Sequence, residues 1–470
     1  MKDGVGQLVL QIVFPEGEAN HGTGETQANG PAVSGAPPTA RSKPERKGKW
    51  YSLIDKVYAL PNLQRAWQQV AANGGAGGSD GMTIARFAEN AEERLAQLSA
   101  DLRDKTYRPQ PVRRVFIPKS GGGQRPLGIP SIRDRIVQQA LRQILEPIFE
   151  AKFSKHSHGF RPEKGCATAL SVVDRAIQHG YQWVVDADLQ AFFDTVDHPK
   201  LIAALNEEIA DGSVLNLITR ILKAGVWLPE TAAVEPTELG TPQGGPLSPL
   251  LANVYLHAFD ARMGQAGYGL VRYADDFVLF AKSEGEAIAA LTLARQVLEE
   301  ELGLRLHPEK TRVVSVAHGF EFLGFHYFRD SKTDQLRKAV RPQSVRRFRE
   351  TIRARTPRLK NQRKPKARRL TRVRLAKNQA LRQLIADLNR FLRGWHWYFK
   401  AVWSPYATPF RDFDGFVRAR VRAAITGRGG PGWWNKRLPN ALLRELGLIP
   451  LEEWHRQYQT GQLASPARKG

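Results

Sequence analysis

The sequence predicts an α+β fold in which a mixed body carries helical additions at both ends. Three observations support this class. Apolar residues recur at helical spacing from Trp50 to Leu102, and helix and strand periods alternate between Tyr107 and Phe328. A strongly basic segment with helical periodicity follows residue 335. No internal repeat interrupts this order.

The composition indicates a folded protein of several domains with a very basic surface. Of its 470 residues, 42% are hydrophobic and 25% charged, which suits roughly two to four folded units. The chain has 70 Lys and Arg against 46 Asp and Glu, a net charge of +24. This excess indicates a polyanionic partner, with nucleic acid ahead of an anionic membrane.

Two classes of protein are excluded by what the sequence lacks. A single cysteine, Cys166, excludes a disulfide framework and a cysteine-based zinc site. The apolar run Leu8–Phe14 is too short to span a bilayer and does not read as a signal peptide. We therefore expect no membrane partner and a cytoplasmic location.

The N-terminal part divides into a leader and a helical extension. Residues 1–48 predict a disordered leader, because Gly, Pro and polar residues dominate and too little apolar area is available for burial. Residues 49–105 predict a helical N-terminal extension, with two helical stretches separated by Asn73–Gly78.

The middle of the chain predicts alternating strands and helices. A strand over Val112–Ile117 leads into the polar hairpin loop Lys119–Arg125. The helices that we expect are Ile132–Phe149, Ala167–Ile177, Pro199–Leu222 and Ala287–Leu302. The strands that we expect are Gln182–Asp188, two runs within Leu270–Phe280, and Phe320–Phe328.

Two acidic clusters, each flanked by strand-forming apolar residues, are the strongest chemical signal. The first is VVDADLQAFFDTVDH (184–198) and the second is YADD (273–276), and Asp275 follows Asp188 by 87 positions. Either cluster alone could be a solvated turn, where Asp is common. Together they need a common cause, and two carboxylate strands that meet can hold two Mg²⁺ ions roughly 4 Å apart. Such a pair of ions stabilises the attacking and leaving oxygens of a phosphoryl transfer.

Weaker signals accompany these clusters. Phe193 follows Asp188 by five residues, where its ring could close against a ribose 2′-hydroxyl. The Gly240–Pro249 loop (GTPQGGPLSP) can bring backbone close to a substrate, although it also fits an ordinary helix start. Lys119 and Arg125 suit a triphosphate, yet basic hairpin tips are usually just solvated, and the same holds for Lys310.

The basic tail leaves two interpretations open. Residues 337–377 contain 18 Lys and Arg and one acid, Glu350. They form either a disordered linker or helices that bury one stripe and present the cations to phosphates. Apolar residues spaced through the segment favour helices, with Val345, Phe348, Ile352, Leu370, Val373 and Leu375 as the buried stripe. Trp395, Trp397 and Tyr398 of LRGWHWYF could stack bases, but rings so closely spaced favour a core role.

The chain resembles the reverse transcriptases encoded by bacterial group II introns from about Trp50 to Trp454. The resemblance rests on motifs that occur in the family's order: IPKSGGGQRPLGIPSIRDRIVQQALRQILEPIFE, HSHGFRPEKGCATAL, VDADLQAFFDTVDH, GTPQGGPLSPLLANVYLHAFD, VRYADDFVLFAKS, HPEKT, FEFLGFHY and LRGWHWYF. The YADD and PQGGPLSP pair is specific for reverse transcriptases, and HSHGFRP with RGWHWYF narrows the resemblance to the group II type.

The resemblance implies a role for each candidate residue. Asp188, Asp275 and Asp276 would be catalytic and hold two Mg²⁺ ions. Substrate contacts would come from Lys119, Arg125, Phe193 as the sugar gate, Gln243 in the nucleotide pocket and Lys310 near the leaving phosphates. RNA contacts are expected from Arg363, Lys364, Lys366, Arg368 and Arg369. Asp186, Asp194 and Asp197 we interpret as local hydrogen-bonding acids.

The implied fold is a right-hand polymerase with a maturase domain. Fingers and palm would span 106–334, the thumb and maturase domain 335–405, and a DNA-binding region without an HNH endonuclease 406–470. The implied function is copying of intron RNA into DNA at a target site and binding of that RNA to assist splicing. Intron RNA, a DNA target with its primer and deoxynucleoside triphosphates would be the partners of a nucleoid-associated protein.

Two alternatives remain at this stage. One is a domesticated reverse transcriptase of the same type that works in DNA repair or defence without an intron. The other is a splicing cofactor whose polymerase site has decayed. The second is disfavoured because Asp188, Asp275 and Asp276 are all present. The sequence leaves the oligomeric state open.

Overall fold

The computed structural model describes residues 48–118, 123–359, 371–402, 410–426 and 438–461. The leader over 1–47 lies outside these ranges, as do Lys119, Arg363, Lys364, Lys366, Arg368 and Arg369. The chain divides into two compact units, which we describe separately. The first comprises Met1–Arg175, Ala187–Phe277 and Ala290–Glu309, and the second comprises Ala176–Asp186, Val278–Ala289 and Lys310–Gly470.

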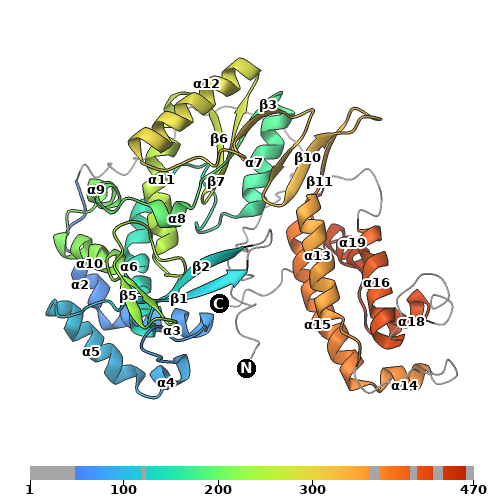
Figure 1. Ribbon diagram of the computed structural model, residues 1–470, viewed down its shortest axis with the longest axis horizontal. Coiled ribbons are helices and arrows are strands. Elements are labelled where there is room, and N and C mark those ends of the chain that lie inside the picture. Colours follow the sequence, from blue (N-terminus) through green and yellow to red (C-terminus); the bar gives the residue numbers. More distant parts are fainter. Residues whose placement is uncertain (1–47, 119–122, 360–370, 403–409, 427–437, 462–470) are drawn as a thin grey trace, which may run out of the picture. The chain divides into compact units, whose positions relative to one another are not determined.

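The first unit begins with a group of helices, of which the first two pack on one long helix. They are α2 (Ile54–Tyr58), α3 (Leu60–Asn73), α4 (Ile84–Ala88) and α5 (Ala91–Arg103), and the long helix is α6 (Ile132–Glu150). Leu63, Ala66 and Val70 of α3 are buried at helical spacing, and α2 and α3 both contact α6 (Figure 1). The helices expected on both sides of Asn73–Gly78 are therefore confirmed.

A four-stranded sheet follows, in the order β2-β1-β4-β5. Its strands are β1 (Val112–Pro118), β2 (Gln124–Ile129), β4 (Val226–Leu228) and β5 (Ala233–Glu235). β1 and β2 pair antiparallel with Ile117 opposite Arg125, which confirms the predicted hairpin. Its tip, residues 119–122, lies outside the described residues.

A second four-stranded sheet has the order β6-β7-β3-β8. Its strands are β3 (Trp183–Asp188), β6 (Gly269–Tyr273), β7 (Asp276–Ala281) and β8 (Arg312–Ser315). The accompanying helices are α7 (Cys166–Gln178), α8 (Phe192–Thr195), α9 (His198–Glu208), α10 (Gly212–Leu222), α11 (Ser248–Gln265), α12 (Glu284–Arg295) and the π-helical turn η1 (Gln296–Glu301). The predicted strand at 182–188 and the two strands around the acidic pair are confirmed.

The second unit ends in a small sheet and a helical bundle. The sheet has the order β11-β10-β9, with β9 (Phe320–Phe322), β10 (Phe325–Arg329) and β11 (Leu336–Val340). The helices are α13 (Pro342–Arg355), α14 (Arg372–Ala376), α15 (Gln379–Phe399), α16 (Arg411–Thr426), α18 (Asn440–Glu445) and α19 (Leu451–Gln459). In Figure 1, α13, α15 and α16 run side by side, and α13 contacts both α15 and α16.

Three element predictions were wrong in detail. The helix expected over Pro199–Leu222 is two helices, because Asp211 begins α10 as its N-cap. The aromatic run Phe320–Phe328 is a hairpin, since Leu323 and Gly324 both adopt positive φ, 45° and 82°, as a tight two-residue turn requires. The basic segment from Arg337 starts in strand β11 rather than in a helix.

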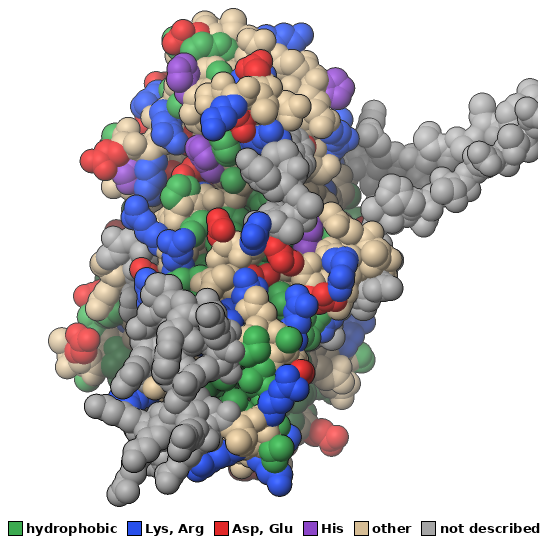
Figure 2. Space-filling model, turned by 90° about the vertical axis from the view of Figure 1, so that its right-hand side faces the viewer, with side chains coloured by type: hydrophobic (Ala, Val, Ile, Leu, Met, Phe, Trp, Pro, Cys, Tyr) green, Lys and Arg blue, Asp and Glu red, His purple; other side chains and the backbone are tan. Residues whose placement is uncertain are grey.

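The predicted apolar stripe of the tail is confirmed in part, and Val345 is only half-buried. Phe348, Ile352 and Leu375 are buried, whereas Val373 is 64% exposed, and Leu370 lies outside the described residues. Trp395 packs its ring against Phe348 and Phe413, at centroid distances of 4.6 and 4.7 Å, so it has the core role that the aromatic spacing favoured. Lys and Arg side chains recur over much of the face drawn in Figure 2.

Candidate active site

Two aspartates from neighbouring strands form the centre of the site. β3 ends at Asp188, and Asp275 lies in the two-residue turn between β6 and β7. β7 and β3 are adjacent in the sheet. The Gln182 N–H before β3 donates to the carbonyl of Ala281, the last residue of β7, at 3.1 Å, so the two strands run antiparallel and Asp188 and Asp275 lie at the same end of the pair. The structure therefore unites acids that are 87 residues apart in the sequence.

The environment of Asp275 disfavours its charged form. Burial raises its pKa above the ordinary value, and the neighbouring carboxylate of Asp188 raises it further. Its own backbone N–H and the guanidinium groups of Arg125 and Arg272 oppose that shift. A cation held between the two carboxylates would relieve their repulsion.

The residues present fit Mg²⁺ as a ligand set of two carboxylates. Among the described residues, no group of three or more His, Cys, Asp and Glu side chains is arranged to hold a metal ion. Mg²⁺ is usually bound by one or two carboxylates, with water and substrate phosphates as its other ligands. Asp188 and Asp275 meet that need. Asp276, the half-buried first residue of β7, remains a predicted third ligand.

The other acids of the first cluster have local structural partners. Asp186 forms an ion pair with Arg312 at 3.2 Å. Asp197 caps α9 and accepts a hydrogen bond from the backbone N–H of Lys200 at 2.8 Å. The predicted role as hydrogen-bonding acids is confirmed for Asp186 and Asp197, and for Asp194 it stays a prediction.

The predicted sugar gate lies in a short helix directly after β3. Ala191 adopts a left-handed conformation, with φ of 48°, and begins α8. Phe192 points into the core, and its ring holds the half-buried ring of Phe193 edge-on, with 5.1 Å between centroids. The Phe193 ring is thus in contact with Phe192 and remains partly exposed.

The glycine-rich loop connects this helix to the β1–β2 hairpin. The Thr241 N–H donates to the Phe193 carbonyl at 2.7 Å, and the Gly128 N–H of β2 donates to the Gln243 carbonyl at 2.9 Å. A side chain on Gly240 would come within 2.7 Å of the Phe193 oxygen, which explains the glycine there. Backbone hydrogen bonds therefore hold the loop that contains Gln243 against the short helix that contains Phe193.

The predicted phosphate contacts are less fully described. Arg125 is exposed on β2, and its positive charge lowers the pKa of Asp275, against the effect of burial. Lys119 lies outside the described residues. Lys310 is exposed and belongs to the second unit, and its contact with phosphate stays a prediction.

Sequence reasoning missed the residues that support the turn containing Ala274 and Asp275. Arg272 is fully buried and paired with Asp260, and the backbone of Gly159 lies against Ala274. A signal was available, because Arg272 is a charged residue inside the apolar strand LVRYADDFVLF. Such a charge requires a buried partner.

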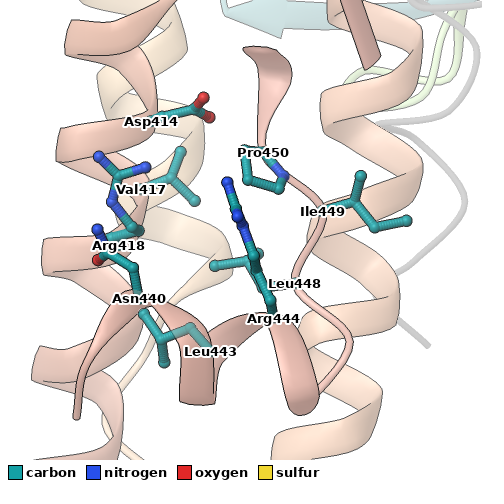
Figure 3. A pocket seen from close by; sticks show the side chains of 9 residues that line it. All are labelled: Asp414, Val417, Arg418, Asn440, Leu443, Arg444, Leu448, Ile449 and Pro450. Carbon is teal, nitrogen blue, oxygen red and sulfur yellow. The ribbon is translucent and has the colours of Figure 1, made fainter. Parts of the chain in front are cut away.

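A small cavity in the C-terminal helices is too confined to be a nucleotide site. Its volume is about 30 Å³, which leaves room for water but not for a nucleotide. Figure 3 shows that Arg418 of α16 and Arg444 of α18 point toward it. No helix among the described residues is long and apolar enough to cross a membrane.

Paired carboxylates on adjacent strands, a flanking aromatic ring and a basic hairpin define a template-directed nucleotide polymerase with fingers, palm and thumb. Comparison with known protein families supports this class. A family described as "Reverse transcriptase (RNA-dependent DNA polymerase)" matches residues 117–327, and one described as "Group II intron, maturase-specific domain" matches residues 366–428.

Individual relatives point the same way. The chain is 35% identical over 290 residues to Protein YkfC of Escherichia coli (strain K12), covering 54% of this chain and 76% of YkfC. It is 46% identical over 171 residues to the Group II intron-encoded protein LtrA of Lactococcus lactis subsp. cremoris, covering 36% of this chain and 28% of LtrA. The chain thus belongs to the group II intron-encoded reverse transcriptases.

Solved structures add only a weak likeness. A chain of a partial Cas6-RT-Cas1–Cas2 complex is 27% identical, with a TM-score of 0.32 over 53% of this chain and 41% of that chain. A telomerase from Candida albicans is 13% identical, with a TM-score of 0.39 over 77% of this chain and 66% of that chain. The family assignment rests on the sequence relatives.

Proposed function

We propose that this reverse transcriptase copies group II intron RNA into DNA at a target site and binds the same RNA to assist splicing. The observation that carries the catalytic part is the close pair of Asp188 and Asp275 at the ends of adjacent strands. The maturase-specific match over residues 366–428 supports the RNA-binding part. The chain aligns with only 28% of the length of LtrA, so that relative alone does not establish the partner. We infer intron RNA as the partner from the family of the chain.

Each residue has a defined task in nucleotide addition. Asp188 and Asp275, with Asp276 beside them, would hold two Mg²⁺ ions. When bound, these ions supply charge neutralisation to the attacking 3′-oxygen and the leaving pyrophosphate. Arg125 and Lys119 bind the triphosphate of the incoming deoxynucleotide, and Lys310 contacts the leaving phosphates.

Selection of the nucleotide depends on Phe193 in α8 and on Gln243 in the glycine-rich loop 240–249. The ring of Phe193 closes against the 2′ position of the sugar, so a hydroxyl there would clash. Gln243 lines the pocket for the nucleotide on the template.

The remaining parts of the chain bind the template and the target. In our proposal residues 49–105 form the N-terminal extension, 106–334 the fingers and palm, 335–405 the thumb and maturase domain, and 406–470 a DNA-binding region. Arg363, Lys364, Lys366, Arg368 and Arg369 contact intron RNA phosphates. The primer is a DNA 3′ end at the target, and the protein works at the bacterial nucleoid.

Asp275→Asn tests the catalytic assignment. The change keeps the size of the side chain but removes a charged metal ligand, so DNA synthesis should fall by at least about 10³-fold, equivalent to several kcal/mol. RNA binding should stay within a few-fold. Primer extension on an RNA template and filter binding on the same preparation measure both.

Asp197→Asn is the matched control, because Asp197 only caps α9. It should retain synthesis. Substantial synthesis by Asp275→Asn would remove this residue from the metal site. If intron RNA binds no better than an unrelated structured RNA of equal length, the domesticated alternative gains, and the DNA flanking the gene would then lack intron RNA domains.

A further inference from the structure

A fully buried arginine lies directly under the turn containing Ala274 and Asp275. Arg272 is in β6, three residues before Asp275, and its side chain has 0% exposure. Its Nε and Nη2 donate to the two carboxylate oxygens of Asp260 in α11, at 2.7 and 2.6 Å. Asp260 is also 0% exposed. The ion pair therefore occupies the Nε and Nη2 groups on one side of the guanidinium.

The other side of the guanidinium reaches the turn itself. Nη1 of Arg272 donates to the Ala274 carbonyl at 2.9 Å and to Oδ1 of Asn253 at 3.1 Å. Asn253 precedes Asp260 by two helical turns, so both lie on the same face of α11. The Nδ2 of Asn253 donates to the Gly159 carbonyl at 2.9 Å. One connected network therefore joins α11, β6 and the segment around Gly159.

The turn that this network contacts is strained and tightly enclosed. Ala274 has φ of 59°, which costs energy for a residue with a side chain and persists only where the surroundings impose it. Gly159 lies so close that a Cβ there would be 2.3 Å from the Ala274 nitrogen. The His158 N–H also donates to the Arg272 carbonyl at 2.8 Å. The backbone before Asp275 is held from two sides.

Stability alone does not account for the arrangement. A buried ion pair contributes little net stability compared with apolar residues of the same size, because both charges lose their hydration. A lysine could neutralise Asp260 as a point charge, but it lacks the planar fork that also reaches Ala274. The feature that needs arginine is the hydrogen bond to the turn.

We propose that Arg272 is a positioning residue that holds the Ala274 carbonyl and thereby fixes the Asp275 carboxylate opposite Asp188, with Asp260 and Asn253 orienting the guanidinium. The inference rests on the proposed metal-binding role of Asp275. Residues that orient metal ligands usually change metal affinity or activity by about 10–100-fold when altered.

Arg272→Lys tests the proposal in the full-length protein. Binding of Mn²⁺ is measured by electron paramagnetic resonance without substrate, and kcat, the KM for deoxynucleotide and the Mg²⁺ concentration for half-maximal rate are measured by primer extension. We expect Mn²⁺ affinity and kcat to fall about 10-fold or more, with the KM within about two-fold. The matched control is Arg135→Lys, because Arg135 is another buried arginine that donates to backbone carbonyls, those of Pro130 and Gly74.

The outcomes separate positioning from folding. If Arg272→Lys and Arg135→Lys lower the melting temperature alike and neither changes Mn²⁺ affinity or kcat, the proposal is overturned. If Arg272→Lys does not fold, Asn253→Ala tests the proposal, since it keeps the Arg272–Asp260 ion pair and removes one hydrogen bond of the guanidinium. Unchanged Mn²⁺ affinity in Asn253→Ala also overturns the proposal. If the wild type makes no DNA on an RNA template, but Arg272→Lys still binds Mn²⁺ more weakly than the wild type does, the positioning role is supported and the proposed function is contradicted.

Discussion

Three aspartates within twelve residues have three different environments. Asp186 is neutralised by Arg312, and Asp197 is used to cap α9. Asp188, between them, ends its strand beside Asp275, whose pKa is raised by burial and then by that neighbouring charge. Side chains of the same chemistry thus serve a salt bridge, a helix cap and, in our proposal, a metal site because of the neighbours that the fold supplies.

At the same scale, Phe193 should control the choice of sugar. Phe193→Ala removes a ring that is in contact with Phe192 and remains partly exposed. Discrimination between a ribonucleotide and its deoxy counterpart should fall by about 10–100-fold, since a local steric fit of this kind is worth roughly 1–3 kcal/mol. The ratio of kcat/KM values for the two nucleotides measures it.

The conservative variant Phe193→Tyr keeps the ring and should keep the discrimination. Synthesis with deoxynucleotides should change little in either variant, because the carboxylates are untouched. A discrimination ratio that is the same in Phe193→Ala as in the wild type would take Phe193 out of the gate.

Individual residues were predictable where their chemistry is visible in a short motif. Asp188 and Asp275 stand out because carboxylates interrupt apolar strands. Arg272 interrupts the same strand, but its partners Asp260 and Asn253 are on α11, and only folding reveals that they face it. The glycine at 159 could not be assigned either, since its reason is the backbone of Ala274, 115 residues later.

At the scale of elements, one carboxylate joins the N-terminal helices to the body of the first unit. Asp211 accepts the N–H groups of Ser213 and Val214 at the start of α10, and also those of Leu53 and Ile54 at the start of α2. Burial alone would raise its pKa, but these four donors together lower it below the ordinary value. The ionised form is therefore favoured by folding.

Asp211→Asn should destabilise the protein by about 1–2 kcal/mol near neutral pH, because an NH₂ group replaces one of the two oxygens and leaves the N–H groups of Leu53 and Ile54, or those of Ser213 and Val214, without their acceptor. Because the folded-state pKa lies below the unfolded value of about 3.9, the contribution is fully present above that pH. It is lost as pH falls through the folded-state pKa. Urea unfolding of both proteins at several pH values should show a gap that is constant at neutral pH and closes in acid.

Asp197→Asn is the control at this scale, since Asp197 caps a single helix through the Lys200 N–H. Its destabilisation should be the smaller of the two. Equal effects of both substitutions, or a gap for Asp211→Asn that persists unchanged well below pH 4, would contradict the double-cap assignment.

Elements were predictable where the period was clear and failed where composition concealed a turn. The run Phe320–Phe328 is aromatic throughout, so only Gly324 marked the turn between β9 and β10. Strand β11 was missed because its Arg337 and Lys338 continue the basic composition of the helix that follows. Both side chains are in fact buried, and the Lys338 ammonium lies 5.7 Å from the Phe325 ring centre.

At the scale of the whole molecule, the order of motifs predicted the family and the fold class, and both are confirmed. Motifs spread over some 400 residues are difficult to match by chance. The family was therefore predicted more accurately than the bounds of individual helices and strands. The net charge of +24 was predicted to serve a nucleic acid partner, and the reverse transcriptase and maturase matches agree with it.

The basic tail gives that charge a measurable consequence. If about a third of the 18 cations in residues 337–377 touch RNA phosphates, log K against log salt should have a slope on the order of −4 to −5, because each neutralised phosphate contributes roughly 0.7–0.9. Affinity would then fall by a few hundred- to a thousand-fold between about 50 and 200 mM salt. Neutralising Arg363, Lys364, Lys366, Arg368 and Arg369 together should flatten this slope by a few units. Extension of a short preannealed primer should suffer less.

A variant with the same loss of charge elsewhere separates contact from net charge. The five exposed cations for it are Lys152, Arg175, Lys223, Lys282 and Arg295. Long-range attraction is screened beyond about 10 Å at 0.1 M salt, so this control should keep a slope near that of the wild type. Salt titrations of all three proteins with structured RNA decide the matter. If the tail variant and the wild type give parallel lines, the segment 363–369 does not touch RNA, and the exposed arginines of α13 become the next surface to test.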